Sequence, residues 1–475
     1  MKVPNPGNTP SLVNARRRIN DSKVIKCNFK LDAKLKKIGI NKKYFVKTYG
    51  CQSNVVDGQN IAGILENMGY SPAPDILDAD LIILNTCAVR ENAELKVFGQ
   101  IGLLKKLSKK PGFIFGICGC MAQEENVVNR IVTKIAHVNF VLGTHNLYEL
   151  PYVIEEVVET KKQVIKVYSK EGDIIEGLPI IRVDKIKAFV NIMYGCDHFC
   201  TYCIVPYTRG KIRSRDKADI IQEINDLIKQ GYQEVTLLGQ NVNDYGIDKK
   251  DGYLFINLLE DVCKTKITRV RFATSNPWNF NKQIADLLLK YKNLMPYFHL
   301  PIQSGDEKML ARMNRKMKID DYINLVKHIR KTIPNVAIST DLIVGFPNET
   351  AAQFNNTLKL FNTIKYDNAY TFIYSKRSGT PAATMPDKIS TSTKQLRLAK
   401  LNELVRKYAK INNEKFLNQV IEVLVEGRSK TDADVLTGYS PEWKVVNFTG
   451  SAKVGTIARV KITSISRFSL NGVVV

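Results

Sequence analysis

Short apolar runs alternate with helical patterns between residue 44 and about residue 150. Three of these runs predict buried strands: Tyr44–Lys47, Leu81–Leu84 and Phe113–Ile117. Between them, Asn60–Met68 and Glu91–Leu104 carry apolar residues at helical spacing. Because strands that alternate with helices usually pair in parallel, this segment predicts an α/β domain with a doubly wound parallel sheet.

A second series of alternating elements runs from residue 186 to about residue 376. Its six expected strands are Ala188–Met193, Glu234–Leu238, Arg269–Phe272, Tyr297–Leu300, Ala337–Val344 and Ala369–Tyr374. The clearest helical pattern between them covers Ile220–Ile228 and stops at Gly231. Six β–α units in succession predict a partial (β/α)₆ barrel, because a complete barrel would need two more units.

The C-terminal part changes character after a Lys/Arg/Leu-rich helical stretch at residues 392–416. The strand-like runs that follow are Val420–Val425, Trp443–Phe448, Ala458–Ile465 and Ser469–Val475. Short strands separated by Gly, Ser and Asp are typical of a small all-β module. The predicted organisation is an extension (1–41), an N-terminal domain (42–160), a central domain (182–411) and a C-terminal module (412–475).

Charge adds a clue about partners. The 475-residue chain carries 70 Lys and Arg against 46 Asp and Glu, a net charge of +24. Residues 1–48 hold 13 basic and 2 acidic side chains, so we expect residues 1–41 to form a flexible basic extension. This charge favours a polyanionic partner, nucleic acid before a membrane surface, although solubility alone also explains it. No membrane span or signal peptide is recognisable, so the expected location is cytoplasmic.

Three cysteines, Cys196, Cys200 and Cys203, lie close together directly after an expected barrel strand; we call them the loop triad. Thiolates suit iron–sulfur clusters, zinc or copper(I). Because a 4Fe-4S cluster takes four ligands, three cysteines would leave one iron open to a substrate or cofactor. The alternatives are a zinc site completed by His198 and unligated core cysteines. Nine cysteines in total, an odd number without an export signal, argue against a disulfide framework.

Three other cysteines, Cys51, Cys87 and Cys120, each follow an expected strand of the N-terminal domain; we call them the sheet triad. Their spacing of about one β–α unit places them at equivalent positions after successive strands. Because such positions converge on the carboxyl edge of a parallel sheet, we expect a second three-thiolate metal site there. Incidental buried thiols are the alternative. The remaining cysteines are expected to be core residues or, in the extension, a free thiol: Cys27, Cys118 and Cys263.

The sequence around both triads resembles the radical S-adenosylmethionine methylthiotransferase family. Its signature is Cys196-x₃-Cys200-x₂-Cys203, with Tyr202 before the last cysteine. Five surrounding phrases are similar too: Lys47-Thr-Tyr-Gly-Cys51-Gln-Ser-Asn54, Asn85-Thr-Cys87-Ala-Val-Arg90, Gly239-Gln-Asn-Val-Asn243, Leu300-Pro-Ile-Gln-Ser-Gly305 and Ser375-Lys-Arg-Ser-Gly-Thr-Pro-Ala382. The resemblance covers residues 43–475. It implies a radical SAM barrel between a methylthiotransferase N-terminal domain and a C-terminal all-β TRAM-like barrel.

The residues at the first cysteine of the sheet triad indicate a branch of that family. Gly50-Cys51-Gln52 resembles the branch that modifies isopentenyladenosine in tRNA, although Ser53 stands where methionine is commoner. The branches for threonylcarbamoyladenosine in tRNA and for a ribosomal-protein aspartate usually have Gly-Cys-Lys-Val-Asn or Gly-Cys-Pro-Lys-Asn there. A sister methylthiotransferase is therefore the runner-up. A nonenzymatic zinc-stabilised RNA-binding protein is the alternative from a different class.

The resemblance implies a tRNA-modification enzyme that methylthiolates C2 of N6-isopentenyladenosine at position 37, beside the anticodon. It implies two 4Fe-4S clusters and two S-adenosylmethionines. The loop triad would hold the cluster at which S-adenosylmethionine yields the 5′-deoxyadenosyl radical that takes hydrogen from C2. The sheet triad would hold the auxiliary cluster that presents sulfur. The implied partners are the tRNA anticodon stem-loop and an electron donor such as flavodoxin or ferredoxin, with no membrane.

Several further residues are candidate contacts. Cofactor or substrate contacts are expected from Tyr202 and from residues that follow barrel strands: Gly239, Gln240, Asn241, Gln303 and Ser304. A plain turn is the alternative for these strand-end residues. The basic run just beyond the loop triad is expected to contact tRNA phosphates, with a solvated face as the alternative: Arg209, Lys211, Arg213 and Arg215. Trp443 and Phe448 would either stack on bases or pack inside the C-terminal module.

Overall fold

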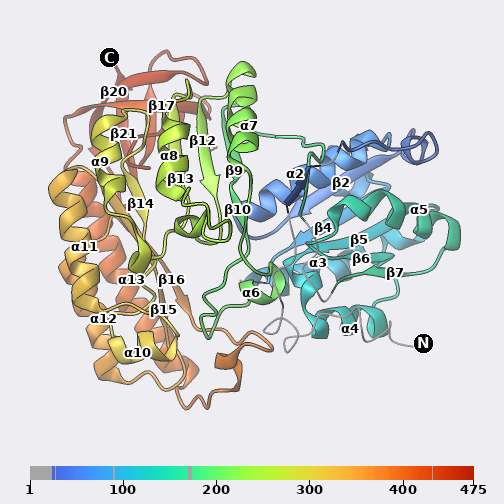
Figure 1. The fold of residues 1–475 in the computed structure, drawn as a ribbon, viewed down its shortest axis with the longest axis horizontal. Coiled ribbons are helices and arrows are strands. Elements are labelled where there is room, and N and C mark those ends of the chain that lie inside the picture. The colour runs from blue at the N-terminus through green and yellow to red at the C-terminus, as the bar shows by residue number, and fades with distance from the viewer. Residues whose placement is uncertain (1–23, 27, 89–90, 169–173, 431) are drawn as a thin grey trace. The chain divides into compact units, whose positions relative to one another are not determined.

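The structure is a computed structural model that describes residues 24–26, 28–88, 91–168, 174–430 and 432–475 (Figure 1). The chain divides into two compact units. The first comprises Met1–Val183, Met193–Asp216 and Ser375–Ala383; the second comprises Asp184–Ile192, Lys217–Tyr374 and Thr384–Val475. Within the described ranges, no helix combines the length and the apolar character needed to cross a bilayer.

A six-stranded parallel sheet, in the order β3-β2-β4-β5-β6-β7, forms the centre of the first unit. Its strands are β2 (Lys43–Thr48), β3 (Ser71–Pro72), β4 (Leu81–Thr86), β5 (Ile114–Gly119), β6 (Phe140–Leu142) and β7 (Val164–Lys166). The connecting helices are α2 (Gln52–Asn67), α3 (Glu91–Leu104), α4 (Glu125–Lys134) and α5 (Leu150–Thr160). Strand order reverses between β2 and β4. The carboxyl ends of these strands therefore form the switch point, where ligands of such sheets bind.

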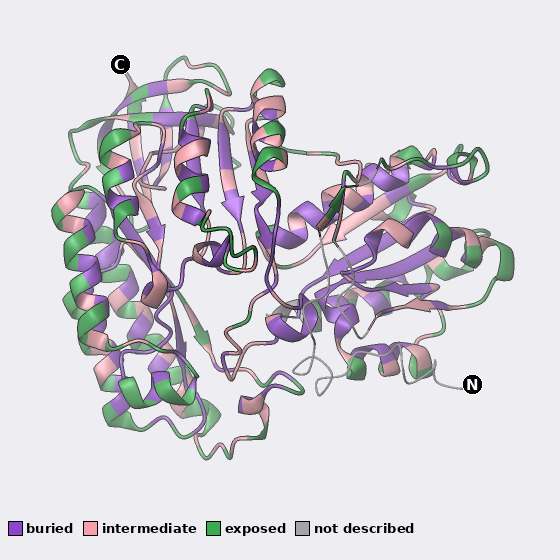
Figure 2. Ribbon diagram, in the orientation of Figure 1, coloured by how far each residue is buried: buried purple, intermediate pink, exposed green. Residues whose placement is uncertain are grey.

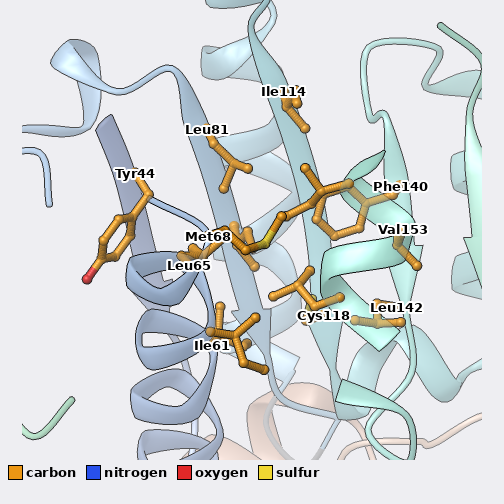
Figure 3. Packing of buried hydrophobic residues seen from close by; sticks show 14 of the residues in the cluster. Tyr44, Ile61, Leu65, Met68, Leu81, Ile114, Cys118, Phe140, Leu142 and Val153 are labelled. Atoms are coloured by element: carbon orange, nitrogen blue, oxygen red, sulfur yellow. The ribbon is translucent and has the colours of Figure 1, made fainter. Parts of the chain in front are cut away.

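Helices cover both faces of this sheet, which confirms the predicted doubly wound arrangement. One apolar cluster joins the sheet to α2 and α5 through residues such as Leu65 and Val153 (Figure 3). A second cluster joins the other face to α3 and α4 through Ile101 and Ile131. Cys118 is fully buried in the first cluster, and this burial raises the pKa of its thiol. The prediction that Cys118 is a core residue is therefore confirmed.

The N-terminal extension ends earlier than the sequence predicts. Strand β1 (Val24–Lys26) pairs in parallel with β8 (Ile174–Glu176), and a short 3₁₀ helix follows at Leu35–Lys37. Leu31 and Leu35 are buried in the apolar cluster that also holds α2 and α5. The prediction of a flexible extension up to residue 41 is therefore wrong for the part of it that the structure describes. The prediction followed the lysine-rich composition and overlooked two leucines that lie in the core. Residues 1–23 and Cys27 lie outside the described residues.

Six parallel strands form the expected partial barrel in the second unit. They belong to two three-stranded sheets, in the orders β13-β12-β9 and β14-β15-β16, which a parallel bridge between Val270 and Leu294 joins. The strands are β9 (Lys187–Asn191), β12 (Glu234–Leu238), β13 (Arg269–Phe272), β14 (Tyr297–His299), β15 (Ala337–Val344) and β16 (Asn368–Ile373). All six coincide with predicted strands to within a few residues.

Amphipathic helices accompany these strands, and they bury one face while the other faces solvent (Figure 2). They are α7 (Lys217–Lys229), α8 (Phe255–Cys263), α9 (Gln283–Lys290), α10 (Glu307–Arg312), α11 (Ile319–Thr332), α12 (Ala351–Ile364) and α13 (Thr391–Glu414). Helix α12 begins with a capping box between Thr350 and Gln353. Burial at the end of α8 raises the pKa of the Cys263 thiol to about 12, so this cysteine is also a core residue.

The C-terminal segment forms a closed five-stranded barrel, in the order β17-β18-β19-β21-β20. Its strands are β17 (Val420–Arg428), β18 (Leu436–Tyr439), β19 (Val445–Thr449), β20 (Ile457–Ile465) and β21 (Ser469–Val474). The sequence pattern missed β18, which is only four residues long. Phe448 is almost completely buried in the barrel core, which confirms packing rather than base stacking as its role.

Candidate cluster-binding site

The sheet triad lies where the topology predicts, at the carboxyl ends of three neighbouring strands. Cys51 is the residue before helix α2, Cys87 follows β4, and Cys120 begins a 3₁₀ helix directly after β5. The Asn54 side chain lies between two of them, with its Oδ1 3.9 Å from the Cys51 Sγ and 3.7 Å from the Cys120 Sγ. The structure therefore brings together cysteines that are more than 30 residues apart in sequence.

Two glycines allow the cysteine-bearing loops to approach one another closely. Gly50 has a φ of +114°, and a Cβ built on it would lie 2.9 Å from the Cys87 Sγ. Gly119 has a φ of +95°, and its Cβ would lie 2.4 Å from the carbonyl oxygen of Thr86. Both the backbone conformation and the space thus require glycine immediately before Cys51 and Cys120.

Asn54 holds the loops of the sheet triad in place. Its Nδ2 donates to the carbonyl oxygens of Tyr49, at 2.9 Å, and Thr86, at 2.7 Å. The Asn85 side chain in turn donates to the Asn54 carbonyl oxygen at 2.6 Å. Because both amide hydrogens of Asn54 are used on backbone oxygens, its Oδ1 remains directed at the cysteines as an acceptor.

Ligand chemistry at the sheet triad fits an iron–sulfur cluster. Burial raises the pKa of the Cys120 thiol to about 12, so this sulfur loses its proton only when a cation compensates the charge. In the described part of the chain, no three Cys, His, Asp or Glu side chains converge on the position of a single metal ion. In a 4Fe-4S cluster the cysteines bind different irons. Three sulfur donors at one edge of the sheet are therefore a ligand set that suits an iron–sulfur cluster.

The loop triad lies in a hairpin that belongs to the first unit. Strands β10 (Met193–Tyr194) and β11 (Arg213–Ser214) pair antiparallel at its base. Between them, the amide of Cys196 donates to the Gly210 carbonyl oxygen and the amide of Cys203 donates to the Cys200 carbonyl oxygen. Cys200 is buried, whereas Cys196 and Cys203 are half-buried, as is Tyr202. The short helix α6 (Val205–Thr208) follows the triad.

This hairpin packs against the sheet triad. Ile204 and Tyr207 form an apolar cluster with Ala88 and Cys120, and Phe199 packs against this cluster. The Thr144 hydroxyl also donates to the Thr208 carbonyl oxygen at 2.9 Å. The two cysteine triads thus share one compact unit, with apolar side chains of the loop covering one cysteine of the sheet triad.

Three of the four basic residues predicted to contact tRNA phosphates are buried, which corrects that prediction. Arg209 donates to Asp57, Arg213 donates to the Arg209 carbonyl oxygen, and Arg215 pairs with Glu176. Each of these arginines is less than 10% exposed. Side chains that already satisfy buried acceptors cannot reach a phosphate. Lys211, which is half-buried, remains a candidate for such a contact.

The predicted contacts at barrel strand ends fall into two groups. Asn241 and Ser304 are fully buried, and they bond to their own framework: the Asn241 Oδ1 accepts from the Asn276 amide, and the Ser304 Oγ accepts from the Asp306 amide. These bonds hold the two side chains in place, and their role as direct contacts stays a prediction. Gln303 is buried with a φ of +75°. Its backbone bonds to Asp341 and Ile343, which ties this turn to β15.

Gly239 and Gln240 are half-buried and remain candidates for ligand contact. Sequence reasoning missed Glu349, which is 3% exposed and accepts from the Gly345 amide and from Arg397, both at 2.8 Å. Burial raises the pKa of the Glu349 carboxyl despite these partners. Nothing in the sequence around Gly345 indicated the buried carboxylate that its amide contacts.

A cavity of about 400 Å³ lies in the second unit, between the barrel strands and the C-terminal module. Aromatic side chains form much of its wall: Tyr297, Tyr370, Tyr439, Trp443 and Phe468. Trp443 stacks on Tyr297, and the Arg271 guanidinium lies over its ring. Phe468 is more than half exposed. Aromatic walls open to solvent are surfaces on which unpaired bases stack.

The fold and the cysteine loop together define a radical S-adenosylmethionine protein. The sequence matches the Radical SAM superfamily over residues 190–361, the uncharacterized protein family UPF0004 over residues 43–143 and the TRAM domain over residues 414–475. The fold also resembles that of the radical S-adenosylmethionine methyltransferase TsrM from Kitasatospora setae. That match has a TM-score of 0.54 and 12% identity, and it covers 72% of this chain and 75% of the other.

Similarity to two named enzymes shows to which family within this class the chain belongs. The chain is 58% identical to the tRNA-2-methylthio-N(6)-dimethylallyladenosine synthase of Malacoplasma penetrans, over 98% of this chain and 95% of that protein. It is 50% identical to the enzyme of the same name from Bacillus cytotoxicus, over 98% and 92% of the two chains. The chain therefore belongs to the tRNA-2-methylthio-N(6)-dimethylallyladenosine synthase family.

Proposed function

We propose that this protein adds a methylthio group to C2 of N6-isopentenyladenosine at position 37 of tRNA. The observation that carries the proposal is the placement of two three-cysteine groups in one compact unit, the sheet triad at the switch point of its sheet and the loop triad packed against it. The near full-length identity to enzymes of that name supports the same activity.

The loop triad would hold a 4Fe-4S cluster with an open iron for S-adenosylmethionine, and the sheet triad would hold a second cluster. When bound, these groups supply radical generation and sulfur, chemistry that belongs to the cofactors. The chain's own contribution is to hold both triads in one unit and to exclude water between them with Ile204 and Tyr207. Gly239 and Gln240 are proposed S-adenosylmethionine contacts, as is Tyr202.

Contacts to tRNA are proposed for the aromatic cavity, for Lys211 and for the basic N-terminal residues. We expect Phe468→Ala to weaken tRNA binding about fivefold, because one base–aromatic stack contributes about 1 kcal/mol. Filter binding of tRNA would measure this change. Exposed Leu289 is the matched control, and an equal loss in Leu289→Ala would contradict a specific role for the cavity. A flavodoxin or ferredoxin as electron donor and a cytoplasmic location complete the proposal.

The test of the reaction uses anaerobically purified, reconstituted full-length protein. It is incubated with S-adenosylmethionine, a strong reductant and tRNA that carries isopentenyladenosine, and the digested nucleosides are analysed by mass spectrometry. The expected result is a mass gain of one methylthio group. Release of 5′-deoxyadenosine without that gain would redirect the assignment to threonylcarbamoyladenosine tRNA or a ribosomal protein. Bound zinc without iron would favour an RNA-binding protein instead.

A further inference from the structure

We propose that Arg209 is a positioning residue that tunes the cluster of the sheet triad through a hydrogen bond to the Cys120 sulfur. The inference rests on the proposed second cluster. It assigns to Arg209, a residue of the loop that carries the other triad, control over the reduction potential of this cluster.

The geometry places the Arg209 guanidinium against the sheet triad with both of its ends engaged. Its Nε lies 3.1 Å from the Cys120 Sγ. Its Nη2 lies 2.6 Å from the Asn54 Oδ1 and 2.5 Å from the Asp57 Oδ2. The planar fork of arginine can donate in two directions at once, which a lysine ammonium on a flexible stem does not reproduce.

The backbone of Arg209 is as firmly held as its side chain. Its amide donates to the Val205 carbonyl oxygen at 2.8 Å, which ends helix α6, and its own carbonyl oxygen accepts from Arg213 at 2.6 Å. The residue is 7% exposed. Arg209 follows Cys203 by only six residues, so it links the hairpin of the loop triad directly to the sheet triad.

The positive charge of Arg209 explains why its contact with the Cys120 sulfur would change the reduction potential of the proposed cluster. Arg209 and Asp57 form a buried ion pair, so the guanidinium remains charged and can donate to a thiolate. Each electron added to an iron–sulfur cluster increases the negative charge on its sulfurs. A donor aimed at a ligating sulfur therefore stabilises the reduced cluster more than the oxidised one and raises its potential.

The test isolates the second cluster in the full-length chain by replacing the loop triad (Cys196→Ala, Cys200→Ala, Cys203→Ala). After reconstitution, iron and sulfide are quantified and the midpoint potential is measured by EPR-monitored titration. We expect Arg209→Gln to shift the midpoint to a more negative value at unchanged iron content. We expect Arg209→Lys to give a smaller shift in the same direction, because it keeps the charge and loses the fork.

Arg215 provides the matched control, because it is equally buried and ion-paired, to Glu176, in the same hairpin. Arg215→Gln should leave the midpoint unchanged. An iron-loaded Arg209→Gln or Arg209→Lys variant with the native midpoint would overturn the inference, as would an equal shift in Arg215→Gln. If Arg209→Gln does not fold, the midpoint potential of the Arg209→Lys variant tests the inference. Absence of iron in the triple-cysteine variant with native Arg209 would instead refute the proposed second cluster.

Discussion

The two cysteine triads lie in the same unit, but they are assembled from the sequence in different ways. The loop triad is local: three cysteines within eight residues form a hairpin whose base is a two-residue strand pair. The sheet triad is distributed, and its geometry depends on the register of three neighbouring strands. A local site is recognisable as a motif and sensitive mainly to its own residues. A distributed site is sensitive to any change that moves the strand ends.

The largest expected effect is loss of reaction products, and the two triads should differ in which products are lost. Cys196→Ala should abolish both methylthio product and 5′-deoxyadenosine, because S-adenosylmethionine would lose its binding iron. Cys51→Ala should abolish the methylthio product but leave 5′-deoxyadenosine release. Both compounds are measured by mass spectrometry of one reaction, with Cys263→Ser as a core-cysteine control. Identical losses of 5′-deoxyadenosine in the two variants would show that the triads do not act separately.

A second test addresses the dependence of the sheet triad on its strand ends. Gly119→Ala should cost about 3 kcal/mol of unfolding free energy, because the new Cβ meets the Thr86 carbonyl oxygen in a strained backbone conformation. It should also lower iron bound by the sheet triad. Chemical denaturation and iron analysis measure the two effects.

Gly112 is the control for that test, since its φ is +72° and nothing lies within 4 Å of its Cβ position. Gly112→Ala should cost only about 1 kcal/mol and leave the iron content unchanged. Equal iron loss in both variants would mean that general destabilisation, rather than displacement of Cys120, disturbs the site.

The smallest effect concerns pH and the sheet triad without metal. Burial raises the pKa of Cys120 from 9.0 to about 12, so the folded apoprotein holds this proton more tightly than the unfolded chain. The resulting stability is complete below about pH 9 and is lost as pH rises towards 12. We expect denaturation midpoints of the apoprotein to fall from pH 8 to pH 10 more than those of Cys120→Ser. A parallel decline in both proteins would assign the effect to other groups.

The sequence predicted the six barrel strands, the three longest strands of the N-terminal sheet (β2, β4 and β5) and the six proposed ligand cysteines, because apolar periodicity and cysteine spacing indicate them directly. It missed β3, β6 and β7, which are only two or three residues long. It failed where a residue's role depends on a partner far along the chain. Arg209 belongs to a basic run, which favours a phosphate contact, and only the fold brings the buried Asp57 to it. Leu31 and Leu35 were similarly hidden among lysines.

The first unit combines three segments that are far apart in the sequence, so the order in which the ribosome makes them affects when the unit can be completed. Its last segment, Ser375–Ala383, carries the amide of Ala382 that donates to the Thr201 carbonyl oxygen at 2.9 Å, within the loop triad. A ribosome must therefore make 383 of the 475 residues before this unit has all of its parts. The doubly wound sheet can form early, as N-terminal domains do, but the loop beside it is completed late. We therefore expect the proposed cluster of the loop triad to be loaded only after most of the chain has been made.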